Sequence, residues 1–358
     1  MKAFRESDLT RDVPLADKTT IGLGGPARFS YAAPSAAALW EAVCWARQSQ
    51  LPWFILGGGS NVVFPDAGFP GLVISVNIRG FRQETVDDKV RWTVGGGETW
   101  DDLVHNAVAQ NHAGIECLSG IPGMVGAAPI QNIGAYGAEV GQVLESVRVL
   151  DLLTGKELVL ARSACGLAYR TSIFKHGPQA GRHVVLSLTL LLEPGGSPNV
   201  SYPDLLRQLE PGASLLQVRA AVLKVRAEKS MLANRQDPNA WSCGSFFTNP
   251  IIEQQHYARF EALAACSHPH WSVGSGLVKL SAAWLIENAG FSKGYVWGTV
   301  GLSEKHCLAL INRGNGSSAD VMGLMEEIKA GVATRFGIQL EPEPVILTRA
   351  FRPWAEIR

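Results

Sequence analysis

The hydrophobic positions of this chain alternate between helical spacing and short β-branched or aromatic runs. From residue 35 to 48 a candidate N-cap serine precedes apolar residues three and four apart, which predicts a helix with one buried face. The run from Trp53 to Leu56 predicts a buried strand that leads directly into a glycine triplet at 57–59. Residues 90–108 repeat this order of strand, glycine turn and helix. Such an alternation predicts an α/β or α+β enzyme.

Further elements are expected beyond residue 140. Residues 147–151 and 183–192 have the composition of strands, and the second run ends in a Glu-Pro-Gly-Gly sequence that is a candidate domain border. Apolar residues at helical spacing within 218–225 and 321–332 predict two helices. We assign both of these apolar stripes to core packing.

Composition and charge narrow the class of protein. With 358 residues, 46% of them hydrophobic, the chain can bury a core of two or three domains, which argues against a single small binding module. Its 32 basic residues balance 32 acidic ones, so we expect neither nucleic acid nor an anionic membrane as a partner. The six cysteines show no CxxC spacing, which favours reduced thiols, and no metal site is expected. Because no apolar leader or bilayer-length apolar stretch is present, we expect a cytoplasmic protein.

Two glycine-rich segments are candidate ligand loops. Residues 57–61 place three glycines, a serine and an asparagine after a strand, where successive amide N–H groups could surround a phosphate, although a plain tight turn is the commoner meaning of such a triplet. Neither a P-loop nor a Rossmann NAD fingerprint is present. Residues 120–137 are mostly small and apolar without a regular period, so they could either wrap a flat ring such as an isoalloxazine or form a connector packed on the core.

Taken in order, the motifs of this chain resemble those of a known family. They are TTIGLGGPA at 19–27, ILGGGSN at 55–61, GIPGMVGAAPIQNIGAYG at 120–137, YRTSIFK at 169–175, GSFFTNP at 244–250 and LEPE at 340–343. Along nearly the whole chain they resemble UDP-N-acetylenolpyruvoylglucosamine reductases, and Tyr202 indicates the first type of that family.

The resemblance implies an α+β fold with three parts. It combines an FAD-binding fold of the vanillyl-alcohol-oxidase (PCMH) type in two lobes with a C-terminal α/β substrate-binding domain. The implied bounds are 1–78 joined by 338–358 for the first lobe, 79–205 for the second lobe and 206–337 for the C-terminal domain.

The resemblance also implies the reaction. NADPH reduces a non-covalently bound FAD, which then reduces UDP-N-acetylglucosamine enolpyruvate to UDP-N-acetylmuramate, a peptidoglycan precursor. Negative charge builds on C2 of the enolpyruvyl group and in its carboxylate, so the reaction needs a group that holds the carboxylate and a proton donor for C2. Arg170 and Glu343 match the first role and Ser245 matches the second. Cys243 is an alternative proton donor, and Glu341 is an alternative to Glu343.

Cofactor and substrate contacts follow from the same resemblance. The expected FAD contacts are Gly57, Gly58, Gly59, Ser60, Asn61, Ile121, Gly123, Gly126, Ala127, Ile133, Gly134 and Ala135. The expected substrate contacts are Tyr202 over the nucleotide sugar and Lys229, Asn249 and Lys279 at the diphosphate. The link after Lys229 is longer than the family pattern. No covalent flavin link is implied, and we expect His112 and Cys117 to be packed or surface residues.

Other functions stay open from the sequence alone. The flavin motifs also suit an FAD-dependent sugar or alcohol oxidase on the same fold, or a catalytically silent nucleotide-sugar-binding protein. The set of Arg170, Ser245 and Glu343 favours the reductase over the oxidase. Because no separate dinucleotide fingerprint is visible, we expect NADPH to alternate with the substrate in one pocket. A monomer is expected.

Overall fold

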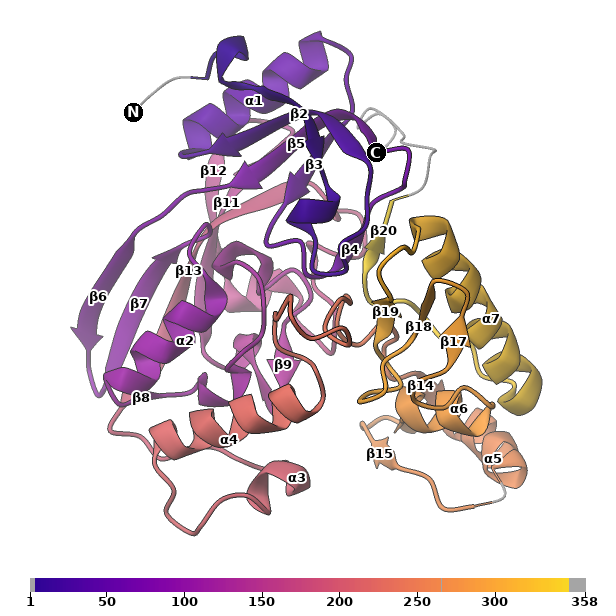
Figure 1. Cartoon of the computed structure of the whole chain (residues 1–358). Helices are drawn as coiled ribbons and strands as arrows, with labels where there is room; N and C mark the ends of the chain where they lie inside the picture. The colour runs from indigo at the N-terminus through magenta and orange to yellow at the C-terminus, as the bar shows by residue number, and fades with distance from the viewer. Residues whose placement is uncertain (1–3, 265, 348–358) are drawn as a thin grey trace.

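The computed structural model describes residues 4–264 and 266–347, which form three regions around a common centre (Figure 1). The first is a four-stranded sheet in the order β1-β2-β5-β3, covered by a helix that packs on β2 and β5. Its elements are β1 (Thr10–Pro14), β2 (Pro26–Ala33), α1 (Ala36–Gln48), β3 (Trp53–Leu56) and β5 (Phe69–Val76). The Ser35 hydroxyl accepts a hydrogen bond from the Ala38 N–H at 3.2 Å, so the predicted helix and its cap are confirmed.

The strand prediction at β3 is right in position but wrong in burial. Leu56 is buried, whereas Trp53, Phe54 and Ile55 are only half-buried. These three residues pack against hydrophobic cores and also line a cavity.

A six-stranded antiparallel sheet forms the second region, in the order β12-β11-β13-β7-β6 with β8 pairing on β13. Its elements are β6 (Phe81–Val86), β7 (Lys89–Gly95), α2 (Trp100–Ala109), β8 (His112–Ala113), β11 (Leu144–Asp151), β12 (Glu157–Ala161) and β13 (His183–Pro194). The strands predicted at 147–151 and 183–192 lie within β11 and β13. The ends of these two strands share a hydrophobic core with α1, which joins the two sheets.

The segment between α2 and β11 has little regular structure, as its lack of a period predicted. It contains the 3-10 helices η3 (Glu116–Leu118), η4 (Val125–Ala127) and η5 (Val140–Gln142) and the strands β9 (Gly134–Ala135) and β10 (Ala138–Glu139). Further 3-10 helices are η1 (Glu6–Asp8), η2 (Ala16–Lys18) and η6 (Arg162–Cys165).

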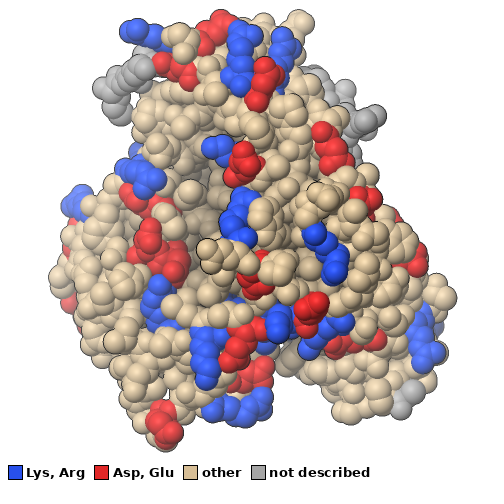
Figure 2. Space-filling view, viewed as in Figure 1, with Lys and Arg blue, Asp and Glu red and all other residues tan. Residues whose placement is uncertain are grey.

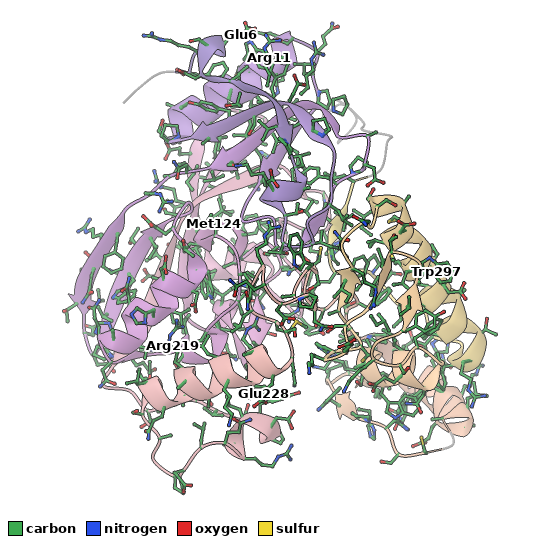
Figure 3. All side chains as sticks on the ribbon, viewed as in Figure 1. Glu6, Arg11, Met124, Arg219, Glu228 and Trp297 are labelled. Atoms are coloured by element: carbon green, nitrogen blue, oxygen red, sulfur yellow. The ribbon has the colours of Figure 1, made fainter. Side chains whose placement is uncertain are left out.

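The third region carries two three-stranded sheets and three helices. Its elements are β14 (Ile251–Glu253), α5 (Gln254–Leu263), β15 (His270–Ser272), β16 (Leu277–Leu280), α6 (Ala282–Asn288), β17 (Val296–Trp297), β18 (Val300–Leu302), β19 (Leu310–Asn312) and α7 (Ser318–Phe336). The long helix α7 packs on α5, α6 and β18 and buries the apolar stripe predicted within 321–332. Trp297 lies beside α7 (Figure 3).

Two helices precede this region: α3 (Pro203–Leu206) and α4 (Leu215–Glu228). The helix α4 packs against α2 and η3, and its buried residues join the core of the second region. The expected boundary between residues 205 and 206 would place α4 in the C-terminal domain, whereas α4 packs on the second region. The boundary itself stays a prediction.

The end of the described chain returns to the first region. The strand β20 (Val345–Ile346) pairs in parallel with β4 (Val62–Val63). This pairing brings Glu343 to the centre of the molecule and fits the prediction that the last segment joins the first lobe. Residues 348–358, which the same prediction includes, lie outside the described residues.

Candidate active site

A cavity of about 590 Å³ lies where the regions meet. Its walls come from β3, the loops at 57–62 and 121–134, the end of α4 and residues 240–245, and most of them are apolar. The volume lies within the range of about 300–1,000 Å³ that is typical of small-molecule and cofactor sites. All the expected FAD contacts except Ala135 line this cavity. Ala135 pairs with Ala138 in the β9–β10 hairpin.

The two glycine loops contact each other at positions that allow no larger residue. A Cβ on Gly58 would lie 2.5 Å from the Gly123 Cα. Gly59 has a φ of +68°, and a Cβ there would overlap the Lys18 carbonyl oxygen. The Ser60 hydroxyl donates to the Pro122 carbonyl at 3.0 Å and ties the loops together.

The cavity fits a ligand that combines a phosphate with flat rings. Glycine loops offer backbone N–H groups to a phosphate, and side chains of β3 and β13 supply apolar walls, among them Ile55 and Val185. The residues present therefore suit FAD. Sequence reasoning located β3 and β13, but it did not indicate that they face a ligand. It also missed Arg226, which lies on α4 and lines the cavity, because the apolar stripe of that helix indicated packing alone.

Arg170 and Glu343 meet at one wall of this cavity. The Arg170 Nε lies 3.3 Å from Glu343 Oε2, and Arg170 Nη2 donates to the Gly134 carbonyl at 2.8 Å. The Nε atom is buried and makes no hydrogen bond to a described residue. Arg170 also has a φ of +52°, a strained value for a residue with a side chain. The guanidinium is thus held beside the Glu343 carboxylate on the cavity wall.

A short pairing between distant segments places Ser245 next to Glu343. The Glu343 N–H donates to the Phe246 carbonyl at 2.9 Å, and the Thr248 N–H donates to the Glu341 carbonyl at 3.0 Å. In this pairing Glu343 is buried and lines the cavity, whereas Glu341 is exposed. The structure therefore favours Glu343 over Glu341 as the acid of the site.

Cys243 and Ser245 both border the cavity but in different environments. Cys243 is buried, its thiol donates to the Val62 carbonyl at 3.6 Å, and burial raises its pKa to about 12. Ser245 is half-buried, and its hydroxyl makes no hydrogen bond to any residue that the structure describes. Ser245 is therefore better placed to face a ligand.

The four expected substrate contacts lie outside the cavity lining, in two pairs. Tyr202 packs edge-to-face on Tyr136, with ring centroids 5.6 Å apart, and Lys229 Nζ lies 3.7 Å from Asp204 Oδ2. Tyr202 precedes the first residue of α3, and Lys229 follows the last residue of α4.

The second pair lies beside Tyr169, the neighbour of Arg170. The Lys279 Nζ lies 4.8 Å from the centroid of the Tyr169 ring, and the Asn249 N–H donates to the Tyr169 hydroxyl at 3.3 Å. Asn249 Oδ1 accepts from the Ala282 N–H at 2.9 Å, which leaves the amide NH₂ group as a donor for another partner.

His112 and Cys117 are packed, as expected. The His112 ring lies edge-on to Trp92, with centroids 5.4 Å apart, and the buried Cys117 thiol donates to the Asn199 carbonyl at 3.7 Å. Neither residue lines the cavity.

Comparison with known proteins decides the family. Residues 236–347 match the family model of the UDP-N-acetylenolpyruvoylglucosamine reductase C-terminal domain, and residues 29–161 match an FAD binding domain. The UDP-N-acetylenolpyruvoylglucosamine reductase of Thermobifida fusca is 44% identical over 353 residues, which cover 95% of this chain and 98% of the relative. The chain belongs to the UDP-N-acetylenolpyruvoylglucosamine reductase family. The reductase of the same name from Saccharopolyspora erythraea is also 44% identical, over 93% of this chain and 94% of the relative.

A solved reductase structure agrees with this result. The UDP-N-acetylenolpyruvylglucosamine reductase of Thermus caldophilus matches with a TM-score of 0.64 and 25% identity, over 95% of this chain and 99% of that chain. The predicted α+β fold, with an FAD-binding part and a C-terminal domain, is confirmed. The predicted enzyme class, a flavin-dependent oxidoreductase with FAD as cofactor, is also confirmed. Among the described residues, no helix of this reductase-family chain is both long and apolar enough to span a bilayer.

Proposed function

We propose that this chain reduces UDP-N-acetylglucosamine enolpyruvate to UDP-N-acetylmuramate with electrons from NADPH. The observation that carries the proposal is that Arg170, Glu343 and Ser245 line the same cavity as the two glycine loops. The chemistry that FAD supplies when bound is hydride transfer, first from NADPH and then to the enolpyruvyl group. Residues 57–61 hold the phosphates of FAD, and residues 121–134 hold its ring system.

The charge near Glu343 suits an anionic reacting group. Arg170 lies beside the Glu343 carboxylate and Lys175 donates to the Glu343 backbone carbonyl, so two cavity-lining cations lie near a single acid. In a site that excludes water, the Arg170 guanidinium stabilises the substrate carboxylate and the charge that develops next to it. Arg170 binds the carboxylate through its guanidinium, and Glu343 orients Arg170.

Ser245 delivers the proton to C2. A serine hydroxyl is a weak acid in water, so this role requires a fixed orientation toward the reacting carbon. The pairing of residues 246–248 with 341–343 supports such an orientation, since it anchors the backbone next to Ser245.

The nucleotide part of the substrate binds outside the cavity, between the two pairs of polar residues. Tyr202 contacts the nucleotide sugar, and Lys229, Asn249 and Lys279 donate to the diphosphate, because ammonium and amide groups are suitable partners for phosphate oxygens. NADPH uses the same pocket in alternation with the substrate. A ternary complex that contains both ligands at once would contradict this alternation.

The assembly and location of the enzyme complete the proposal. We place it in the cytoplasm as a monomer, with a first lobe of 1–78 and 338–358, a second of 79–205 and a C-terminal domain of 206–337. Figure 2 supports the absence of a nucleic-acid partner, because basic and acidic side chains are interspersed on the face shown without a continuous basic stripe.

Anaerobic turnover tests the proposed function. Purified protein with FAD should oxidise NADPH only when UDP-N-acetylglucosamine enolpyruvate is added, and mass spectrometry should find a product two hydrogens heavier than the substrate. NADPH oxidation that instead needs oxygen would support the oxidase alternative. A protein that binds FAD and substrate but leaves NADPH unchanged would be the silent binding protein.

A further inference from the structure

A network of hydrogen bonds links Glu343 to three other residues of the cavity wall, Asn61, Gln131 and Lys175. The Lys175 Nζ donates to Gln131 Oε1 and to the Glu343 carbonyl, both at 3.0 Å. The Gln131 Nε2 donates to Glu343 Oε1 at 2.9 Å, and the Asn61 Nδ2 donates to Gln131 Oε1 at 2.8 Å. These side chains come from both glycine loops and from the segment that follows Arg170. The network therefore converges from separate parts of the chain on a single carboxylate.

Lys175 determines the direction of each of these bonds. An ammonium group has three donors and no acceptor, so the Gln131 atom that faces Lys175 must be the amide oxygen. The amide nitrogen of Gln131 then faces Glu343 Oε1 and must donate to it. The Asn61 group that faces the same Gln131 oxygen must be its NH₂. An amide side chain has two orientations of similar shape, and here one cation selects between them.

The network leaves Glu343 with a single orientation. Its Oε1 is occupied by Gln131, and its Oε2 lies beside the guanidinium of Arg170. The carboxylate is buried, and hydrogen bonds in such a setting are stronger than in water. Burial lowers the pKa of Lys175, whereas the charge of Glu343 acts in the opposite direction, which is consistent with a desolvated ion that needs these acceptors.

We propose that Lys175, acting through Gln131, is a positioning residue that holds the Glu343 carboxylate in register with Arg170 for the reduction of the enolpyruvyl group. This inference rests on the proposed function. The nicotinamide of NADPH carries no carboxylate, so its half-reaction does not need the Arg170–Glu343 pair. Loss of the network should therefore slow reoxidation of the flavin by the enolpyruvyl substrate and leave its reduction by NADPH nearly unchanged.

The first test is Lys175→Met, which keeps most of the length of the side chain but removes its donors. We expect reoxidation by the enolpyruvyl substrate to slow about 10–100-fold, as a misplaced catalytic group would cause. Reduction by NADPH, the FAD content and the melting temperature should stay close to those of the wild type. The matched control is Lys89→Met, since Lys89 is an exposed lysine 3.5 Å from Glu193. Lys175→Arg, which remains a donor-only cation, should recover part of the rate.

The second test is Gln131→Glu, which is nearly isosteric. One oxygen of the new side chain still accepts from Lys175 and Asn61, but the other replaces the donor 2.9 Å from Glu343 Oε1. Two carboxylates at this distance must share a proton, and the pKa of such a pair is raised. Reoxidation should therefore proceed at acidic pH and fall as the pH rises, with an ionisation that the wild type lacks.

A matched control exists for this variant as well. Gln255 Nε2 donates to Glu253 Oε2, also at 2.9 Å, but on the exposed surface. Because water screens charges there, Gln255→Glu should leave the pH profile unchanged.

Three results would overturn the inference. Lys175→Met and Gln131→Glu could reoxidise as the wild type does, in which case the network does not position Glu343. The rates of both half-reactions and the FAD content could all decrease, which would mean that the network only maintains the structure of the site. If the wild type itself accepts NADPH electrons but is not reoxidised by the substrate, the proposed function fails, and the inference fails with it for that separate reason.

Discussion

Ser245 is the side chain on which proton delivery depends. Ser245→Ala should bind FAD and be reduced by NADPH at nearly the wild-type rate, because neither step needs the hydroxyl. Reoxidation by the enolpyruvyl substrate should slow about 10²–10⁴-fold, the usual contribution of a general acid. Single-turnover absorbance of each half-reaction measures the two rates separately. Equal losses in both would show that Ser245 acts on the structure of the site.

Cys243 provides the complementary prediction two residues away. Its thiol is buried, directed to the Val62 carbonyl and raised in pKa to about 12, so it should not exchange protons with a substrate. Cys243→Ala should keep both half-reactions close to wild type, as the same single-turnover assay would show. If Cys243→Ala loses reoxidation while Ser245→Ala retains it, the two roles must be exchanged.

Sequence motifs predicted which residues gather at the site but not how they are oriented. Arg170, Ser245 and Glu343 were identified from three motifs, and all three line one cavity. Lys175 stood inside one of these motifs, and Gln131 stood inside the segment 120–137, both without an assigned role. Their role depends on a hydrogen-bond direction that exists only once the distant segments are folded together.

A charged pair adds to the apolar contact between α2 and α4. Arg219, labelled on α4 in Figure 3, donates to both oxygens of Asp101 on α2, at 2.7 and 2.8 Å. The Gly120 N–H donates to Asp101 Oδ1 at 2.6 Å. Burial alone would raise the pKa of Asp101, but the hydrogen bonds from Arg219 and Gly120 outweigh it, so the pKa is lowered. The pair therefore stabilises the fold while Asp101 is ionised.

Asp101→Asn should lower the free energy of unfolding, and the loss should depend on pH. A lowered folded-state pKa means that the carboxylate stabilises the protein above its unfolded pKa of about 3.9 and loses this effect as the pH falls through the folded value. We expect a loss of about 1–3 kcal/mol at neutral pH, and a smaller one below about pH 4. Urea unfolding at several pH values measures both. A loss that stays constant down to acidic pH would contradict the account.

At the scale of elements, the hydrophobic period predicted which helices form better than it predicted which elements they pack against. The buried face of α2 and the stripes of α4 and α7 are apolar where the sequence indicated. Yet α4 packs on α2, although sequence reasoning placed it with the C-terminal domain. A hydrophobic stripe shows which face of a helix is buried, but not which element covers that face.

The first lobe and the C-terminal region are connected at the start of α7. Asp66 accepts hydrogen bonds from the Ser318 N–H at 2.7 Å, the Ser318 hydroxyl at 2.8 Å and the Ala319 N–H at 3.3 Å. A carboxylate at a helix N-terminus is stabilised by the N–H groups and the helix dipole. Asp66 thus joins two regions that both contribute walls to the cavity.

Loss of the Asp66 hydrogen bonds should lower stability and increase local opening in both regions. Asp66→Ala should cost about 1–2 kcal/mol of stability and increase amide hydrogen exchange both in α7 and at the β4–β20 pairing. Ser317→Ala is the control, because Ser317 caps α7 only from within its own segment. Faster exchange in α7 alone for both variants would mean that Asp66 acts as a local cap.

At the scale of the whole molecule, the proposed function requires that electrons pass from NADPH to an enolpyruvyl sugar nucleotide within one cavity. Anaerobic stopped-flow absorbance tests it most directly, with NADPH added first and UDP-N-acetylglucosamine enolpyruvate second. We expect the flavin band to bleach with NADPH and to return when the substrate is added. A band that bleaches but returns only with oxygen would leave the fold intact and contradict the proposed reaction.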